Sequence, residues 1–369
     1  MSSRPQGIQP MHAPLISIII PTFNVEAYLP DCLASITEQE FQRIEIIAVD
    51  GASEDGTIKI LEEAAGKEPR LAAYYLGRIG PGIARNEGAR HAKGEYIWFV
   101  DGDDLISAGA LGLIADRIEA ASPDVLFIDY QASYPNDKIE PGDGHYLMSR
   151  KTPKCFALAE QPWVIDLNMV SWTKIIRRAF YLSANVDFWP DPPHEDIHVS
   201  CTLLMKASRL SILNQVCYTY RKYRVGSAMG TGSPKRHFNI FPPYEVVLKY
   251  AAEKVGDGDQ RVTEEVWRTF FQRAIWHYTS IFDAGASGSE PFRANRLIAP
   301  RDRRDFFTRM HQYYVDFVPP GYRRPLGFRG IKFGLIEKNS YWTYRALTPA
   351  NKIRVTMSRK IRSVCRKSL

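Results

Sequence analysis

The chain has 369 residues, of which 45% are hydrophobic and 24% charged, a composition that is ordinary for a globular protein with a full core and room for two domains. Its five cysteines are scattered without a C-x-x-C pair, which argues against a disulfide framework or a zinc knuckle. The net charge is +7, and residues 301–369 alone hold 17 lysines and arginines against four acids. A polyanionic partner is therefore expected for that basic segment.

Residues 1–13 are polar and expected to be flexible, and the first apolar run, residues 15–20, is too short for the core of a signal peptide. No stretch reaches the roughly 18 uninterrupted apolar residues that a membrane-spanning helix needs. Together with the unpaired cysteines, these features suit a reducing compartment, so we expect a cytoplasmic protein.

Strands and helices are expected to alternate through the first 130 residues. The apolar runs predict strands at 15–20, 44–49, 71–76, 96–100 and 124–129, with helices at 26–38, 57–66, 81–92 and 107–121 between them. Asn24 is the expected N-cap of the first helix. This alternation predicts an α/β fold, a Rossmann-like and mostly parallel sheet with helices on both faces. Right-handed crossovers bring the carboxyl ends of the strands to one edge, where residues 21–24, 50–55 and 101–104 should meet.

The pattern changes after residue 130. Residues 130–162 are polar and rich in Pro, Gly and Asp, which predicts loops or short strands, whereas 172–182 has a helical pattern. A further helix should start near His194, and a strand is expected over 211–223. Helical periodicity then dominates at 244–255, 263–282 and 301–317. We therefore predict a catalytic domain over 14–240 and a helical, basic C-terminal domain and tail over 241–369.

The strand at 96–100 leads directly into Asp101, Asp103 and Asp104. Three acids in four residues repel one another unless a cation lies among them. Mg²⁺ and Mn²⁺ prefer oxygen ligands and usually reach a protein through one or two carboxylates, with substrate phosphates completing the shell. We therefore expect Asp101 and Asp103 to hold such a metal on a phosphorylated substrate. The alternative is a solvated turn that precedes the next helix.

Several motifs occur together in an order that resembles the family 2 glycosyltransferases, which have an A-type nucleotide-sugar-binding fold. They are Pro21-Thr22-Phe23-Asn24, Asp50-x-x-Ser53-x-Asp55-Gly56-Thr57, Ala84-Arg85-Asn86-x-Gly88, the stretch from Gly94 to Asp104, Trp172-x-Lys174, Glu195-Asp196, and Tyr220-Arg221 with Gly226-Ser227. The similarity covers about residues 15–240 and is strongest to bacterial members that build wall and surface polymers. It implies an inverting transfer of a sugar from a nucleotide-diphosphate donor to a hydroxyl acceptor.

The resemblance also implies roles for single residues. Asp103 would ligate Mn²⁺ or Mg²⁺, and Asp101 would lie against the metal shell or the ribose. The donor nucleotide would contact Pro21, Thr22, Phe23, Asp50 and Arg85. The family commonly has two acids after its second strand, and here the second is replaced by Gly51. Because that second acid often reads uracil, a UDP-sugar is favoured but a different base stays open.

His194-Glu195-x-x-His198 also matches the H-E-x-x-H pattern of zinc peptidases, in which two histidines on one helical face bind the metal. No acid lies between Val199 and Tyr244 to serve as a third ligand, and Pro192-Pro193 puts His194 at the helix start. The resemblance favours Asp196 as the catalytic base, with Glu195 second. A zinc peptidase and a non-catalytic sugar- or nucleotide-binding module are the alternatives.

Two basic features complete the predicted site. Arg221 and Arg224 follow the last strand and could hold the leaving diphosphate, because guanidinium groups match phosphate geometry.

Residues 351–369 have apolar positions at helical spacing among basic ones, which is typical of a helix on an anionic membrane. We therefore expect a nucleotide-sugar donor, an acceptor that is a glycan, a lipid-linked glycan or a small molecule, and peripheral contact with the inner membrane face. The sequence contains no recognisable nucleic-acid-binding module, so nucleic acid is not expected as a partner.

Overall fold

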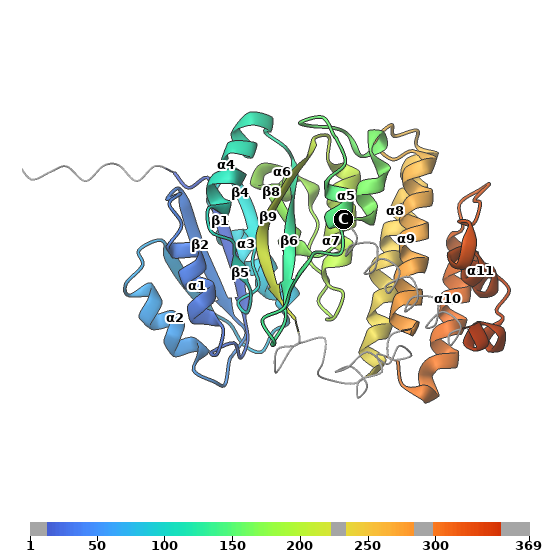
Figure 1. Ribbon diagram of the computed structural model, residues 1–369, viewed down its shortest axis with the longest axis horizontal. Helices are drawn as coiled ribbons and strands as arrows, with labels where there is room; N and C mark the ends of the chain where they lie inside the picture. Colours follow the sequence, from blue (N-terminus) through green and yellow to red (C-terminus); the bar gives the residue numbers. More distant parts are fainter. Residues whose placement is uncertain (1–12, 223–233, 284–297, 348–369) are drawn as a thin grey trace, which may run out of the picture.

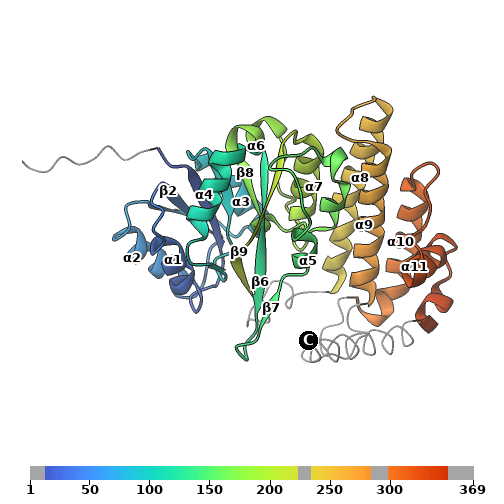
Figure 2. The same cartoon turned by 45° about the horizontal axis from the view of Figure 1, so that its top comes forward.

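The computed structural model describes residues 13–222, 234–283 and 298–347. Within them, an α/β part that contains the sheet lies beside a group of helices formed by the C-terminal third of the chain (Figure 1). The turned view in Figure 2 shows α8 and α9 between the α/β part and the outermost helices α10 and α11.

The described residues form one nine-stranded sheet with the order β3-β2-β1-β4-β8-β6-β9-β5, and β7 pairs with β6 outside this row. The strands are β1 (Ile16–Thr22), β2 (Ile44–Asp50), β3 (Leu71–Tyr75), β4 (Tyr96–Phe99), β5 (Leu105–Ile106), β6 (Val125–Ser133), β7 (Ile139–Pro141), β8 (Lys174–Arg177) and β9 (Leu210–Arg221). Neighbours among β3, β2, β1 and β4 are parallel, as are β6 and β9, whereas β8, β5 and β7 run antiparallel to their neighbours. The predicted mostly parallel α/β sheet is confirmed.

Both faces of the sheet are covered because its central strands have apolar side chains on both faces. In β1, Ile19 packs into one core, and Ile18 and Ile20 pack into the other. Successive side chains of a strand point to opposite faces, so such a strand must be buried on both sides. All seven residues of β1 and all four of β4 are buried.

The helices match most of the predicted ranges. They are α1 (Leu29–Thr37), α2 (Thr57–Ala65), α3 (Pro81–His91), α4 (Ala110–Ala121), α5 (His145–Met148), α6 (Arg178–Ala184), α7 (Asp196–Lys206), α8 (Phe241–Gly256), α9 (Glu264–Asp283), α10 (Arg303–Phe317) and α11 (Gly327–Glu337). Short 3-10 helices are η1 (Leu158–Glu160), η2 (Pro162–Asp166), η3 (Ser171–Thr173), η4 (Pro234–Ile240) and η5 (Pro300–Asp302).

One apolar core continues across the predicted domain boundary. Phe241 and Tyr278 of the C-terminal helices belong to the same buried cluster as Ile19 of the sheet. Ile240, at the boundary itself, is fully buried. The helices beyond residue 240 therefore pack against the α/β part, and the division at 240 stays a prediction.

Two local predictions are wrong. The helix expected over 172–182 is a 3-10 turn, then strand β8, then α6, because Ile175 and Ile176 are buried between β4 and β6 on opposite faces of the sheet. Asn24 does not cap α1, which starts five residues later. Asn24 instead has a positive φ of 50°, and its Oδ1 accepts a hydrogen bond from the Glu54 amide at 2.8 Å.

The membrane predictions concern different parts of the chain. Across 13–222, 234–283 and 298–347, no helix combines the length and the apolar character needed to cross a bilayer. The basic amphipathic segment at 351–369 and the flexible N-terminus up to residue 12 lie outside the described residues.

Helix α3 approaches the sheet so closely that it requires a glycine. A Cβ atom at Gly88 would lie 2.3 Å from Cγ2 of Ile19 in β1. We expect Gly88→Ala to lower the free energy of unfolding by about 1–3 kcal/mol through overpacking. Gly112→Ala is the matched control in α4, where a Cβ meets nothing within 4 Å. It should raise stability by about 0.5–1 kcal/mol. Urea denaturation measures both values, and equal changes in the two variants would contradict this packing.

Candidate active site

The residues predicted to line the crevice lie together where β1, β2 and β4 end side by side. Thr22 is the register partner of Asp50, and its hydroxyl donates to Oδ2 of Asp50 at 2.9 Å. Ser53 adds two hydrogen bonds, from its hydroxyl to Oδ2 at 2.6 Å and from its amide to Oδ1 at 2.8 Å. Asp50 is fully buried, so its carboxylate holds the 50–53 turn in place. Gly51 lies beside it, where a Cβ would approach the Ile79 carbonyl to 3.0 Å.

The predicted nucleotide-binding residues at the end of β1 differ in exposure. Pro21 and Thr22 are buried, whereas Phe23, the residue after the strand, is 41% exposed. The guanidinium of Arg78 lies over the Phe23 ring, 6.0 Å from its centroid. An accessible aromatic ring and a cation therefore stand next to the Asp50 turn, an arrangement against which a planar group can stack.

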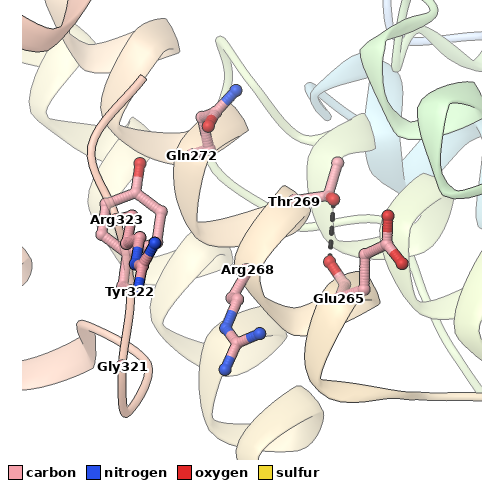
Figure 3. A pocket seen from close by; sticks show the side chains of 7 residues that line it. All are labelled: Glu265, Arg268, Thr269, Gln272, Gly321, Tyr322 and Arg323. Atoms are coloured by element: carbon pink, nitrogen blue, oxygen red, sulfur yellow. Dashed lines mark hydrogen bonds between the residues drawn. The ribbon is translucent and has the colours of Figure 1, made fainter. Parts of the chain in front are cut away.

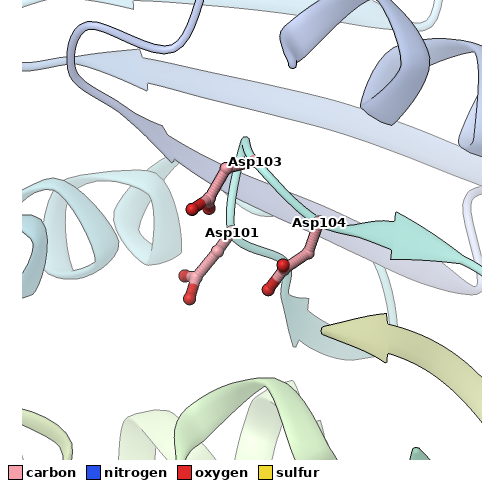
Figure 4. A group of neighbouring side chains, drawn as sticks. All are labelled: Asp101, Asp103 and Asp104. Carbon is pink, nitrogen blue, oxygen red and sulfur yellow. The ribbon is translucent and has the colours of Figure 1, made fainter. Parts of the chain in front are cut away.

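Asp101, Asp103 and Asp104 lie on one turn after β4, and Figure 4 shows the side chains of Asp101 and Asp103 projecting to the same side. Each acid offers one oxygen, and these oxygens lie within 4.8 Å of one another. Asp101 and Asp103 are partly exposed, whereas Asp104 is fully buried.

Asp104 ties the turn to strand β9. Its Oδ2 accepts a hydrogen bond from the Tyr218 hydroxyl at 2.7 Å, and its Oδ1 accepts one from the Arg221 amide at 2.7 Å. Burial, together with the nearby Asp101, raises the pKa of Asp104 well above its usual range. Asp104 therefore faces β9, and α4 begins only after Gly109.

The donor set fits a hard divalent cation. Asp101 uses Oδ1 for an ion pair with Arg85, and Oδ2 accepts no hydrogen bond from the described part of the chain. Both oxygens of Asp104 accept hydrogen bonds from β9, whereas Asp101 and Asp103 are the two partly exposed carboxylates of the group. Two carboxylates with open positions for phosphate and water match the way proteins bind Mg²⁺ and Mn²⁺.

Arg85 joins the metal side of the crevice to the opposite helix. Its Nη2 donates to Asp101 Oδ1 at 2.7 Å, and its Nη1 donates to Glu195 Oε1 at 2.8 Å. Its side chain is 6% exposed, and its guanidinium also lies 5.4 Å from the Phe188 ring centroid. Arg85 was expected near the base or diphosphate. Here it is an ion-pair bridge between the end of β4 and the start of α7.

Two neighbours in α3 keep that bridge in place. Asn86 pairs with the backbone of Phe188, accepting from its amide at 2.9 Å and donating to its carbonyl at 3.3 Å. A Cβ at Gly82 would lie 2.5 Å from the Trp189 carbonyl and 3.3 Å from Cβ of Glu195. The start of α3 and the 188–195 segment are therefore in direct backbone contact, which brings Arg85 within reach of Glu195.

Glu195 and Asp196 stand at the N-terminus of α7, as predicted. Glu195 is held by Arg85, and Asp196 Oδ2 accepts a hydrogen bond from the Ser171 amide at 3.2 Å. Burial is the largest influence on Asp196 and raises its pKa, with Glu195 acting in the same direction, while Arg85 and Lys174 oppose it. A carboxylate with a raised pKa at the edge of a crevice is suited to accept a proton.

Arg221 ends β9 beside the acidic turn. Its guanidinium donates to Asp31 Oδ2 at 2.8 Å and to the Asp103 carbonyl at 3.3 Å, so it stands next to the metal candidates. Arg224, Gly226 and Ser227, predicted alongside it, lie outside the described residues.

The two histidines of the H-E-x-x-H pattern do not converge. His194 precedes α7 with a φ of +83°, and its ring packs against His237 and His277, with centroids 5.7 and 5.4 Å away. The His198 ring faces the Asp187 carbonyl and Trp189. Among the described residues, neither histidine belongs to a group that could hold a metal ion. The geometry contradicts the zinc-peptidase alternative.

A separate hollow of about 440 Å³ lies on the helical part, between α9 and the loop before α11 (Figure 3). Arg268, Gln272 and Tyr322 are among its lining residues. Arg268 donates to Glu264 and to the Pro320 carbonyl, so its charge already has partners in the chain. None of the predicted site residues that the structure describes lines this hollow.

Comparison with known proteins gives a family match for the part of the chain that contains the acidic turn. The family described as "Glycosyl transferase family 2" matches residues 17–181, a segment that contains the Asp50 turn, Arg85 and the acidic turn at 101–104. This segment is a family 2 glycosyltransferase domain. Glu195 and Asp196 follow shortly after the matched segment.

The family 2 domain has bacterial relatives. The chain is 28% identical over 213 residues to "Uncharacterized glycosyltransferase EpsJ" of Bacillus subtilis, covering 57% of this chain and 61% of EpsJ. It is 29% identical over 266 residues to "Poly(ribitol-phosphate) beta-N-acetylglucosaminyltransferase TarS" of Staphylococcus aureus, covering 69% of this chain and 44% of TarS. The chain therefore spans about half the length of these relatives.

The fold extends beyond the family 2 domain. The crystal structure of TarS residues 1–349 in complex with UDP superposes with a TM-score of 0.66 at 23% identity, covering 91% of both chains. The same TarS fragment in complex with UDP-GlcNAc gives 0.65 at 24%. The A-type glycosyltransferase fold with its helical C-terminal region is thus confirmed.

Residues that the sequence did not single out also build the site. Tyr218 anchors Asp104, and the Ser171 amide supports Asp196. Trp172, which belongs to the Trp172-x-Lys174 motif, is 5% exposed and stacks on Tyr218, with centroids 4.6 Å apart, so it packs in the core. No local signal marks Tyr218 or Ser171, because their contacts join segments more than 20 residues apart.

Proposed function

We propose that the chain is a metal-dependent, inverting glycosyltransferase that moves a sugar from a nucleotide-diphosphate donor, with UDP-sugars favoured, to an acceptor hydroxyl. The observation that carries this proposal is the Arg85 bridge. It sets the Asp101 and Asp103 pair on one side of a crevice against Glu195 and Asp196 on the other. A donor-binding side and a proton-accepting side are the two parts that such a transfer requires.

The donor side is supported by charge and fold. The carboxylates of Asp101 and Asp103 would hold Mn²⁺ or Mg²⁺, which would neutralise the charge that develops on the leaving nucleoside diphosphate. Arg221 lies beside Asp103 and would add a positive charge to the same phosphates. TarS, which has the same fold, has been crystallised with UDP and with UDP-GlcNAc. We propose that the nucleoside lies against Phe23 near the Asp50 turn.

The acceptor side depends on Asp196. We propose that its carboxylate takes the proton from the acceptor hydroxyl while the hydroxyl oxygen attacks the anomeric carbon from the face opposite the leaving diphosphate. One displacement of this kind inverts the anomeric centre. General base catalysis typically contributes about 10²–10⁴-fold in rate. Glu195, held by Arg85, would orient the start of α7.

The relatives suggest an acceptor class. TarS, by its name, modifies poly(ribitol-phosphate), and we propose an acceptor of the same general kind for this chain, a surface glycan or a lipid-linked precursor. We also propose that the protein works in the cytoplasm, with the basic segment beyond residue 350 on the inner membrane face.

A donor panel tests the function. Release of nucleoside diphosphate is measured for UDP-, GDP-, TDP- and CDP-sugars with Mn²⁺, with and without an acceptor mixture of lipid-linked glycans. We expect release from at least one donor, with UDP-sugars the fastest, and loss of release when the metal is chelated. Donor binding without turnover on any donor would favour a non-catalytic binding module instead.

A further inference from the structure

Lys174 is a buried cation that the proposed chemistry does not use. It is the first residue of β8, 1% exposed, and its Nζ lies 5.5 Å from the centroid of the Phe127 ring. The ammonium group donates to the carbonyls of Val170 at 2.8 Å and Asn168 at 3.0 Å, and to the Thr173 hydroxyl at 3.3 Å. All of these partners belong to the turn at 168–173, so Lys174 holds that turn together.

The same turn supports the candidate base. The Ser171 amide, in the middle of the closed turn, donates to Asp196 Oδ2 at 3.2 Å. Any movement of residues 168–173 would move the one amide donor to Asp196 among the described residues. The position of the carboxylate is therefore coupled to the hydrogen bonds that Lys174 makes.

Electrostatics couples the two groups as well. The Asp196 carboxylate is repelled by the like charges of Glu195 and Asp101 and attracted by the opposite charges of Arg85 and Lys174. The Lys174 ammonium group interacts electrostatically with Asp196, with Cys201 of α7 and with Arg273 of α9. Burial lowers the pKa of Lys174, and the attraction of Asp196 acts against that change. Loss of the positive charge at Lys174 would leave Arg85 as the main group that favours ionised Asp196.

We propose that Lys174 is a positioning residue for the transfer reaction, holding the 168–173 turn so that the Ser171 amide keeps the Asp196 carboxylate oriented and ionised. The inference rests on the proposed function, because it takes Asp196 to be the base. It goes beyond that function in assigning a role to a side chain that cannot touch the donor or acceptor.

Lys174→Met tests this role, because methionine keeps an unbranched side chain but removes the charge and the donors. We expect kcat to fall about tenfold or more, a loss of about 1.4 kcal/mol, with the donor KM unchanged. The base must be ionised, so activity is lost as pH falls through its pKa. Removing a nearby positive charge raises that pKa, and the acidic limb of the kcat profile should move to higher pH. Lys174→Arg should restore part of both values.

Lys206→Met is the matched control. Lys206 also donates to a carbonyl, that of Ala184 at 2.6 Å, and lies 5.7 Å from the Tyr250 ring centroid. It is at the other end of α7, ten residues or about 15 Å from Asp196. Its replacement should leave the pH profile unchanged even if the melting temperature falls. A Lys174→Met profile that overlays the wild-type profile would overturn the inference.

A second variant covers the case in which Lys174→Met does not fold. Ser171→Pro removes the amide hydrogen at the first position of η3, where proline is tolerated, and Val170 already has the φ of −71° and ψ of 148° that a following proline favours. The variant also removes the Ser171 hydroxyl, which is buried and makes no hydrogen bond to the described residues. It should shift the acidic limb in the same direction as Lys174→Met, and an unshifted limb would contradict the inference. Absence of turnover in the wild-type chain on every donor would refute the proposed function itself, a separate outcome.

Discussion

Asp103→Ala is expected to reduce sugar transfer by about a thousandfold or more. Asp103 is a partly exposed carboxylate beside Asp101, in a group whose oxygens lie within 4.8 Å of one another. Its loss would remove a ligand of the proposed metal, and metal stabilisation of developing phosphate charge is worth several kcal/mol. Release of nucleoside diphosphate measures the rate. Titration calorimetry with UDP in the presence of Mn²⁺ should show weaker binding in the same variant.

Asp116→Ala is the control for this result, because Asp116 is an exposed acid on α4 outside the crevice. It should keep wild-type turnover and UDP binding. Asp104→Ala is expected to behave differently from Asp103→Ala. Asp104 is buried and holds Tyr218 and the Arg221 amide, so its replacement should lower the melting temperature. Unchanged turnover in Asp103→Ala would contradict the proposal that Asp103 is a metal ligand.

Asp196→Asn should lower transfer by at least about a hundredfold while leaving UDP binding intact. Asparagine has the shape of aspartate but cannot accept the acceptor's proton, and the Ser171 amide can still donate to its carbonyl oxygen. The measurement pairs steady-state kcat with UDP affinity by calorimetry. A drop in both would indicate a folding or donor-binding defect instead of a lost base.

Two further variants decide which acid is the base. Glu195→Gln is expected to have a smaller effect on kcat, because Oε1 of Glu195 is already held by Arg85. Asp191→Asn, on the exposed part of the same approach to α7, should have none. If Glu195→Gln alone produces the hundredfold loss, the base is Glu195 and Asp196 is its neighbour.

Local sequence patterns were sufficient for most of the elements and for the chemistry of single residues. Continuous apolar runs predicted β1, β2 and β4 as strands buried on both faces, and the acids after β4 followed as residues at the sheet edge. These predictions succeed because strand burial and carboxylate repulsion act between near neighbours in the chain. The placement of Glu195 and Asp196 at a helix start succeeded because Pro192 and Pro193, just before them, disfavour a helix interior.

Tertiary contacts decided how those residues work together. The sequence around β8 has a helical pattern, but antiparallel pairing with β4 and β6 makes it a strand. That pairing is non-local, so the local pattern does not predict it. Asp50 turned inward because Thr22 and Ser53 satisfy its carboxylate. Arg85 reaches Glu195, 110 residues away, only because Gly82 and Asn86 bring α3 against the 188–195 segment. Composition and periodicity describe only residues that are near one another in the chain, so they cannot predict a contact over this separation. The bridge between the two sides of the crevice is formed by the packing of α3, β4 and α7.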